Sequence, residues 1–230
     1  GLTNGIWEVR ECHDLVSAEI GRWLLLDRAI KLGRARRPWR GTPTAWVAAR
    51  ADAGDRVRAV VGKRGFAPLA FDGPLAEEPD ATGLLAVICG LLPPADPRAA
   101  RLVDATVEAL GDGPFLRRYR SEVDDGFRGV EGTFVPASWW VVSALAILGR
   151  AEEAQLRADA MCEVLPLLMP EEWDVEGNAS LGNLPLVWSH IEAARALSLL
   201  HLTRIRRRFG TPGVAAWRLW RFLYLRVTPN

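Results

Sequence analysis

Apolar side chains recur at helical spacing through most of this chain, and proline and glycine divide the pattern into segments. In the first segment Ile20, Trp23 and Ile30 fall on one face, and Asp27 and Lys31 form an i,i+4 pair. The same spacing predicts about eight helices. Their expected ranges are 15–32, 42–62, 84–92, 96–111, 136–148, 151–165, 185–208 and 211–226.

Residues at the segment ends agree with these ranges. Asp80 precedes the third segment as an expected N-cap, and Asp96-Pro97 opens the fourth with proline at the first helical position. In the second segment Asp52 and Arg56 are expected to pair on the outer face. The chain therefore predicts helices with defined starts and stops.

Strand patterns are scarce, and the best of them, at 65–71, is weak. Two long loops are expected at 111–135 and 166–183, and loops of that length in a helical domain are often functional. No repeat, low-complexity tract or domain boundary is visible. We therefore expect an all-α chain that forms a single helical domain over residues 1–230.

The composition is that of an ordinary globular protein. Hydrophobic residues make up 49% and charged residues 25%, and 29 basic residues balance 28 acidic ones. This balance gives no indication of nucleic acid or a membrane as partner. Ten tryptophans against two tyrosines favour either aromatic packing or a sugar site.

The cysteines indicate a reducing compartment. Cys12, Cys89 and Cys162 are odd in number and far apart, so a disulfide framework is not expected. The first residues show no signal-peptide pattern, and no apolar run is long enough to span a bilayer. We therefore expect a cytoplasmic protein. Because the chain lacks an initiator Met, it could be a fragment, a processed product or a trimmed form.

Two distant segments each place a carboxylate beside a tryptophan. Trp7 precedes Glu8 near the start, and Glu171-Glu172 precede Trp173 in the second long loop. Cleavage of a sugar acetal needs one protonated carboxyl as acid and one ionised carboxyl to activate water. An indole can raise the pKa of a nearby carboxyl and offers a flat surface to a sugar ring.

Further short segments follow one another in a fixed order over nearly the whole chain. They are Gly5-Ile6-Trp7-Glu8-Val9-Arg10, residues 23–32 (WLLLDRAIKL), Arg64-Gly65-Phe66, Asp80-Ala81, Leu91-Leu92-Pro93-Pro94 with Asp96-Pro97-Arg98, Arg118-Tyr119-Arg120, Glu131-Gly132-Thr133-Phe134, Trp139-Trp140, and Pro170-Glu171-Glu172-Trp173-Asp174 with Leu181-Gly182-Asn183, Pro185 and Ser189-His190. No single segment is specific, but the ordered set resembles glycoside hydrolase family 15, the glucoamylase and trehalase-like enzymes. The resemblance is to the C-terminal portion of the catalytic domain.

This resemblance implies a fold, a reaction and roles for particular residues. The fold would be an α/α toroid of six helical hairpins, of which this chain supplies the C-terminal part. The enzymes invert configuration and need no metal or other cofactor. Glu8 would be the general acid and Glu171 the general base, with Glu172 as the second candidate. Arg118 would bind sugar hydroxyls, and Trp7 and Trp173 would form walls of the site, so Trp7, Arg118, Glu172 and Trp173 are the expected substrate-binding residues.

Two departures from the family pattern fall near the expected site. Residues 12–16 read Cys-His-Asp-Leu-Val where the family usually has a His-Phe-Thr-like stretch, and residues 184–186 read Leu-Pro-Leu where it has Phe-Pro-Gln. The earlier helices of the family domain, including an Arg-Asp pair that grips the sugar, are not found. About eight helices do not close a ring of six hairpins.

Several residues also have simpler interpretations. Glu8 could be a surface carboxylate, Glu171-Glu172 a solvated acidic pair, and Arg118 one member of a surface basic cluster with its neighbours. His190 is expected to be a hydrogen-bonded structural histidine. The basic run at Arg204 and 206–208 is expected to be a solvated helix end, and the aromatic last helix to pack on the body or on a partner chain rather than on a membrane.

Two functions follow from these observations. The first is an inverting α-glycosidase that acts on small α-glucosides, with a small carbohydrate as its partner. The second is a catalytically inactive half-toroid that binds carbohydrate or a partner protein, and homo-oligomerisation or a separate N-terminal portion could complete either one. Neither requires nucleic acid or a membrane.

Overall fold

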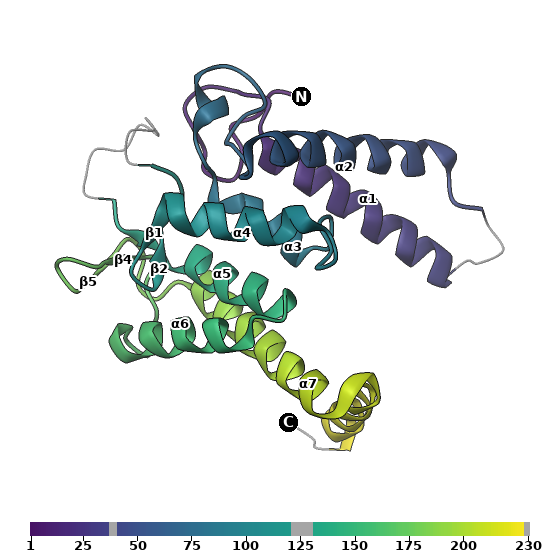
Figure 1. Ribbon diagram of the computed structural model, residues 1–230, viewed down its shortest axis with the longest axis vertical. Helices are drawn as coiled ribbons and strands as arrows, with labels where there is room; N and C mark the ends of the chain where they lie inside the picture. Colours follow the sequence, from purple (N-terminus) through teal and green to yellow (C-terminus); the bar gives the residue numbers. More distant parts are fainter. Residues whose placement is uncertain (37–40, 121–130, 228–230) are drawn as a thin grey trace.

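The computed structural model describes residues 1–36, 41–120 and 131–227. Over these ranges the chain is mainly helical, which confirms the all-α class (Figure 1). The α-helices are α1 (Val16–Arg36), α2 (Thr44–Arg64), α3 (Leu84–Ile88), α4 (Pro97–Leu110), α5 (Val135–Ile147), α6 (Ala151–Val164) and α7 (Val187–Val227). Two 3-10 helices, η1 (Pro74–Glu77) and η2 (Ala81–Gly83), lie between α2 and α3.

Helices α1 and α2 lie side by side as a hairpin (Figure 1). The predicted pair within α1 is present, with Lys31 Nζ 2.8 Å from Asp27 Oδ2. Asp27 is almost fully buried and also pairs with Arg28 and with Arg50 of α2. A single carboxylate thus joins the two helices.

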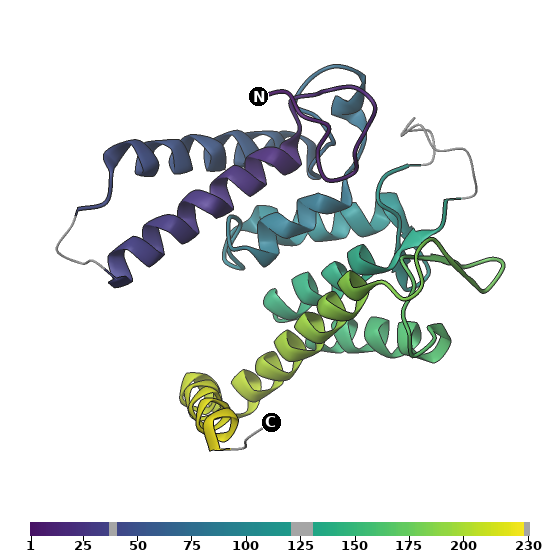
Figure 2. The ribbon, with the colours of Figure 1, turned by 180° about the vertical axis from the view of Figure 1, so that it is seen from behind.

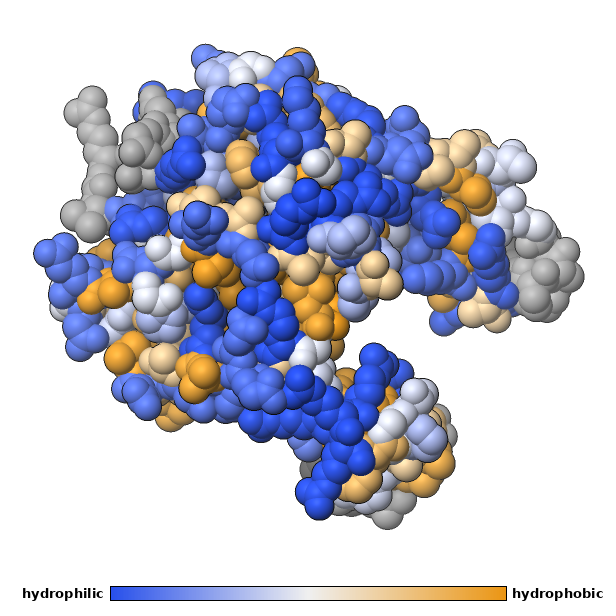
Figure 3. Space-filling view, viewed as in Figure 1, coloured by the Kyte–Doolittle hydropathy of each residue, from blue (hydrophilic) through white to orange (hydrophobic). Residues whose placement is uncertain are grey.

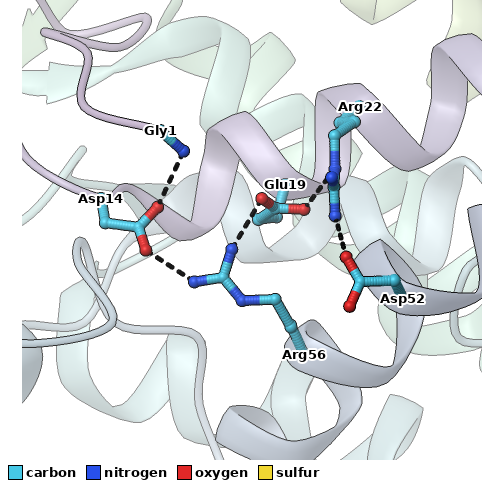
Figure 4. A network of polar contacts seen from close by, with 6 residues as sticks. All are labelled: Gly1, Asp14, Glu19, Arg22, Asp52 and Arg56. Carbon is cyan, nitrogen blue, oxygen red and sulfur yellow. Dashed lines mark hydrogen bonds and ion pairs between the residues drawn. The ribbon is translucent and has the colours of Figure 1, made fainter. Parts of the chain in front are cut away.

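A polar network at the start of α1 ties the N-terminal segment to α2 (Figure 4). Arg56 donates to Glu19 at 2.7 Å and to Asp14 at 2.6 Å, and Glu19 also accepts from Arg22 at 2.8 Å. The predicted pairing of Arg56 with Asp52 is wrong. Arg56 reaches across to α1 and the segment before it, while Asp52 pairs with Arg22.

The predicted helix caps are confirmed, but one helix is shorter than expected. Asp80 Oδ1 accepts from Thr82 N at 2.8 Å, and Asp96 Oδ1 accepts from Arg98 N at 3.0 Å at the start of α4. The expected helix over 84–92 ends at Ile88. Gly90 follows at a φ of +87°, which is outside the range of a right-handed helix.

Helix α5 forms the centre of the core. Its residues from Val135 to Ala146 are all buried, because the segment is apolar on every face. It packs against α3, α6 and α7, as Figure 1 and Figure 2 show from opposite sides. Elements from both ends of the chain therefore meet on one helix.

Helix α7 bends sharply at Gly210. The backbone there has φ 66° and ψ −167°, a conformation available essentially to glycine alone. The break separates two helical stretches, as the sequence predicts, and the second stretch projects from the body (Figure 2). Exposed apolar side chains cover part of this projection (Figure 3), among them Leu219, Trp220 and Leu223.

Short strands lie in the two segments that were predicted as long loops. Strands β1 (Gly111–Asp112) and β2 (Phe115–Leu116) form one pair, and β3 (Thr133–Phe134), β4 (Glu172–Asp174) and β5 (Ala179–Leu181) form an antiparallel sheet in that order. The predicted strand at 65–71 is wrong. That segment makes single bridges, Leu15 with Ala70 and Pro68 with Pro79, which involve two different partner segments and do not extend into a ladder.

Other sequence expectations concern the surface and the cysteines. All three cysteines carry free thiols. In the part of the chain that the structure describes, no helix combines the length and apolarity that crossing a bilayer requires. The same residues contain no cluster of three or more His, Cys, Asp or Glu side chains that could hold a metal ion.

Candidate active site

Glu8 lies in a tight N-terminal turn, with its side chain exposed and its backbone at a φ of +54°. The turn is closed by backbone bonds between Thr3 and His13, each 2.9 Å long. The Asn4 amide supports it further by donating to Val9 O at 2.7 Å. Glu8 is therefore accessible to solvent on a segment whose course is fixed on both sides.

The Trp7 side chain points away from that of Glu8 and anchors this turn in the core. Its indole is buried, and Nε1 donates to Asp80 Oδ1 at 2.9 Å. The ring meets Phe134 edge-on at a centroid distance of 5.2 Å and Tyr119 at 6.3 Å. Asp80, predicted only as a helix cap, thus has a second role that no local sequence signal reveals.

Arg118 lies at the centre of the candidate site. Its side chain is 17% exposed, with Nε 2.9 Å from Glu131 Oε1 and Nη2 3.3 Å from Glu172 Oε1. Its guanidinium lies 5.8 Å from the ring centroid of Trp7 and 5.3 Å from that of Tyr119. Burial acts to lower the pKa of Arg118, but Tyr119, Glu131 and Glu172 outweigh it and raise that pKa.

The three neighbouring arginines do not form one surface cluster. Arg117 pairs with Asp112 at 2.9 Å, and Arg120 Nη1 lies 3.8 Å from Glu78 Oε2. Only Arg118 of the three faces the two glutamates and the aromatic rings. This arrangement favours a functional interpretation of Arg118.

Glu172 reaches Arg118 from strand β4. Its carboxylate also accepts from Gly132 N at 3.1 Å, and its side chain is 12% exposed. Burial raises the pKa of Glu172, aided by the charges of Glu131 and Glu171 and opposed by Gly132 N–H and Arg118. Glu172 is thus a partly buried carboxylate held by one cation.

Trp173, the next residue of β4, is buried. Its ring stacks on Phe115 at a centroid distance of 6.3 Å, and successive residues of a strand point to opposite faces. The sequence predicted Trp173 as a wall of the sugar site, and this contact stays a prediction. In the present geometry the indole packs in the core beside the site.

Glu171 is held by the segment that follows β5. Its Oε2 accepts from Asn183 Nδ2 at 2.7 Å and from Asn183 N at 3.1 Å. Gly182 permits this approach, because a Cβ there would lie 2.9 Å from Glu171 Oε2. Gly182 and Asn183 therefore bind one carboxylate oxygen of Glu171: Gly182 leaves room for it, and Asn183 donates two hydrogen bonds to it.

The start of α7 positions the same segment. Ser189 Oγ donates to Pro170 O at 2.7 Å, and His190 Nε2 accepts from Met169 N at 3.1 Å. The prediction that His190 is a hydrogen-bonded structural histidine is confirmed. The residues before Glu171 are thus tied to α7, and Glu171 itself is tied to the start of α5, since Val135 N donates to Glu171 O at 3.0 Å.

These contacts join the two carboxylate–tryptophan segments. Trp7 contacts Arg118, Arg118 pairs with Glu172, and Glu8 and Glu171 are the respective neighbours of Trp7 and Glu172 in the chain. Trp7 and Glu172 therefore lie beside one arginine, and Glu8 and Glu171 are adjacent to them in the chain. The arrangement has the groups that a sugar site uses, namely carboxylates, a fork of N–H donors and aromatic faces.

Comparison with known proteins gives relatives of one kind. No family model matches the chain. It is 34% identical over 220 residues to a trehalase of Mycobacterium tuberculosis and 35% identical over 224 residues to a trehalase of Mycolicibacterium smegmatis. Each match covers 91% of this chain and 31% of the relative, so the chain spans about a third of these trehalases.

Two solved structures share the fold. One is a glycosidase variant in complex with glucose and the other a wild-type glycosidase, and each has a TM-score of 0.67. The sequence identities are 20% and 21%, and the similarity covers 85% of this chain and 54% of those chains. Together with the sequence relatives, these findings place the chain in the trehalase-like and glucoamylase-like glycoside hydrolases, where it corresponds to the C-terminal part of the trehalases.

Proposed function

We propose that this chain carries both catalytic carboxylates of an inverting α-glycosidase, with trehalose or the end of a short maltooligosaccharide as substrate. Glu8 is the general acid and Glu171 the general base. The observation that carries the proposal is the contact series Trp7–Arg118–Glu172, which brings the two carboxylate segments to one arginine. The helices form part of an α/α toroid, and the rest of its ring lies outside these 230 residues.

The reaction needs two proton transfers. Glu8 gives its proton to the glycosidic oxygen as the bond between that oxygen and the anomeric carbon breaks. Glu171 takes a proton from a water molecule, whose oxygen forms the new bond to the anomeric carbon from the opposite face. Solvent then restores both carboxyls. Inversion requires the two carboxyls to stand about 6.5–9.5 Å apart, which leaves room for that water.

The environments of Glu171 and Glu172 favour Glu171 as the base. Both hydrogen bonds to Glu171 from Asn183 end on Oε2, which fixes the carboxylate plane. Among the described residues no side chain or backbone group is hydrogen-bonded to Oε1, which leaves that oxygen to bind a water. Both oxygens of Glu172 are engaged, Oε1 by Arg118 and Oε2 by Gly132 N. Glu172 therefore holds Arg118 in place, where its guanidinium can bind sugar hydroxyls.

The test is glucose release from trehalose, maltose and isomaltose, with NMR detection of the first anomer formed. Glu8→Gln and Glu171→Gln should each abolish release while the fold is retained. The unaltered protein should first release α- and β-glucose in equal amounts from trehalose, because inversion changes only the attacked anomeric carbon. Glu11→Gln and Glu176→Gln are matched controls, since both are exposed glutamates near the site segments. Full activity in either catalytic variant, or α-glucose as the sole first product from trehalose, would contradict the proposal.

A second function is favoured by the exposed apolar surface. Leu25 and Leu32 of α1 are 70% and 57% exposed, and Trp220 of α7 is 60% exposed. In this alternative the chain is an inactive half-toroid that binds carbohydrate or a partner protein. It predicts sugar binding by calorimetry or self-association by light scattering, without glucose release from any of the three sugars.

A further inference from the structure

Asp80 is a buried carboxylate that the proposed reaction does not use. It is 1% exposed, and its Oδ1 accepts both from Thr82 N at 2.8 Å and from Trp7 Nε1 at 2.9 Å. Its Oδ2 accepts from Thr82 Oγ1. Burial raises the pKa of Asp80 to about 6, and the hydrogen bonds from Thr82 and Trp7 only partly oppose this.

Capping alone does not account for this arrangement. A helix cap needs one acceptor for one or two backbone N–H groups. Asp96 is an example, since it caps α4 while its carboxylate pairs with Arg98 near the surface. Asp80 is instead withdrawn from solvent, with no cation within ion-pair distance among the described residues. Its extra contact is the indole N–H of Trp7, from a segment far away in the sequence.

That contact leads directly to the proposed catalytic acid. Trp7 precedes Glu8, whose backbone has a φ of +54°, so the direction of the Glu8 side chain depends on how this turn is held. The hydrogen bond to Asp80 fixes the Trp7 ring in rotation and in depth. A shift of the indole would carry the Glu8 turn with it.

The same segment also fixes the arginine at the centre of the site. Ala81 N donates to Arg118 O at 2.9 Å, directly after Asp80 in the chain. The Arg118 guanidinium in turn lies 5.8 Å from the Trp7 ring centroid. Residues 80 and 81 therefore hold both the indole and the backbone of the arginine that faces it.

We propose that Asp80 is a positioning residue of the glycosidase site, which holds the Trp7 indole and thereby the Glu8 turn in register with Arg118. It touches neither the sugar nor the reacting water. The predicted effects on kcat rest on the proposed function. Its structural content, that the Glu8 turn depends on Asp80, can be tested without any activity.

The kinetic test compares two substitutions of Asp80. Asp80→Ala removes the acceptor and should lower kcat roughly tenfold to a hundredfold with little change in KM, because misplacing a catalytic group by about 1 Å costs that much. Asp80→Asn keeps an oxygen facing Trp7 and should restore most of kcat. Trp7→Phe should match Asp80→Ala, and the double variant should be no slower than either single one.

Asp96→Ala is the matched control, because it removes an aspartate cap from α4, away from the site. It should lose stability, by about 1 kcal/mol for a lost cap, and keep its kcat. If Asp80→Ala lowers kcat no more than Asp96→Ala does, the positioning role is refuted. Should Asp80→Ala not fold, Trp7→Phe carries the same comparison, since it removes the N–H donor and part of the indole but keeps an aromatic ring.

An NMR measurement separates this inference from the proposed function. In ¹⁵N-labelled protein, Asp80→Ala should shift both the Trp7 indole N–H and the Glu8 backbone amide, and Asp96→Ala should shift neither. A Glu8 amide that does not move would overturn the positioning role whatever the activity. Shifted resonances in a protein that releases no glucose would instead overturn the proposed function alone.

Discussion

Replacement of Arg118 by alanine tests whether the centre of the site is also a source of stability. The substitution removes a cation that pairs with both Glu131 and Glu172. It also removes a guanidinium that lies over the rings of Trp7, Tyr119 and Phe134. Glu172, which is 12% exposed beside Arg118 in the unaltered protein, then keeps its neighbouring negative charges without that countercharge.

The expected loss of stability follows from these contacts. Removing one partner of a fully buried ion pair costs about 3–5 kcal/mol, and an exposed pair contributes about 0–1 kcal/mol. Arg118 and Glu172 are 17% and 12% exposed, so a loss of about 2–3 kcal/mol in the free energy of unfolding is expected. Arg117→Ala is the matched control. Its pair with Asp112 is 38% and 34% exposed, and its loss should cost less than about 1 kcal/mol.

The pH dependence gives a sharper test. The pKa of Glu172 is already raised in the folded protein, and loss of Arg118 should raise it further. At a pH below the pKa that Glu172 has in the unfolded chain, its carboxyl is protonated in both the folded and the unfolded state and does not lower the free energy of unfolding. As the pH rises through the folded pKa, only the folded state resists ionisation, so the cost of Arg118→Ala should grow from acidic to neutral pH.

Urea unfolding of Arg118→Ala at about pH 4 and pH 8 measures this growth. The double variant Arg118→Ala/Glu172→Gln should lose most of it, because the ionisable partner is gone. A penalty equal to that of Arg117→Ala, or one independent of pH, would refute the assignment of Arg118 as the countercharge of Glu172. The glucose-release assay on the same variants would then report the catalytic cost separately.

Two further predictions concern single positions. Asp27→Asn should cost about 1–2 kcal/mol at neutral pH, measured by urea unfolding, and little in acid. Burial acts to raise the pKa of Asp27, but its cationic neighbours hold it below the usual value, so its stabilisation is present above the unfolded pKa and lost as pH falls. Gly182→Ala should reduce the rate of glucose release more than tenfold, because the new Cβ displaces Glu171 Oε2, and its effect on the free energy of unfolding should be the smaller one. An unchanged kcat would contradict the role of Gly182 and Asn183 in positioning Glu171.

The helices of this protein could be predicted from the sequence because their signals are local. Asp96-Pro97 sets the start of α4, and the apolar segment after Pro136 becomes the buried helix α5. The sheet β3-β4-β5 could not be predicted, since each strand has two or three residues and no alternation can be detected over that length. Its ladder depends on contacts such as Thr133 with Trp173, which no local pattern encodes.

The site shows the same division. The candidate residues Glu8, Arg118 and Glu171 could be proposed from ordered segments and stay predictions, but their hydrogen-bond and ion-pair partners could not be predicted. Asp80 already had a sufficient local explanation as a cap, so its bond to Trp7 was missed. For Arg118, sequence alone did not separate a surface cluster from a binding role, because that choice depends on which carboxylates lie opposite in space.

The contacts of the site also indicate what sets the distance between the two proposed catalytic carboxyls, those of Glu8 and Glu171. The Glu8 turn is held through Trp7, and the Glu171 segment is held by Asn183 and by the start of α7. Arg118 joins the two sides through the Trp7 ring and Glu172. Every link in this series comes from within the chain, so the separation of the two carboxyls depends on its own packing. On the proposed roles of Glu8 and Glu171, contacts within this chain would set their separation, and the parts of the trehalase relatives that the chain does not match would bear on substrate choice.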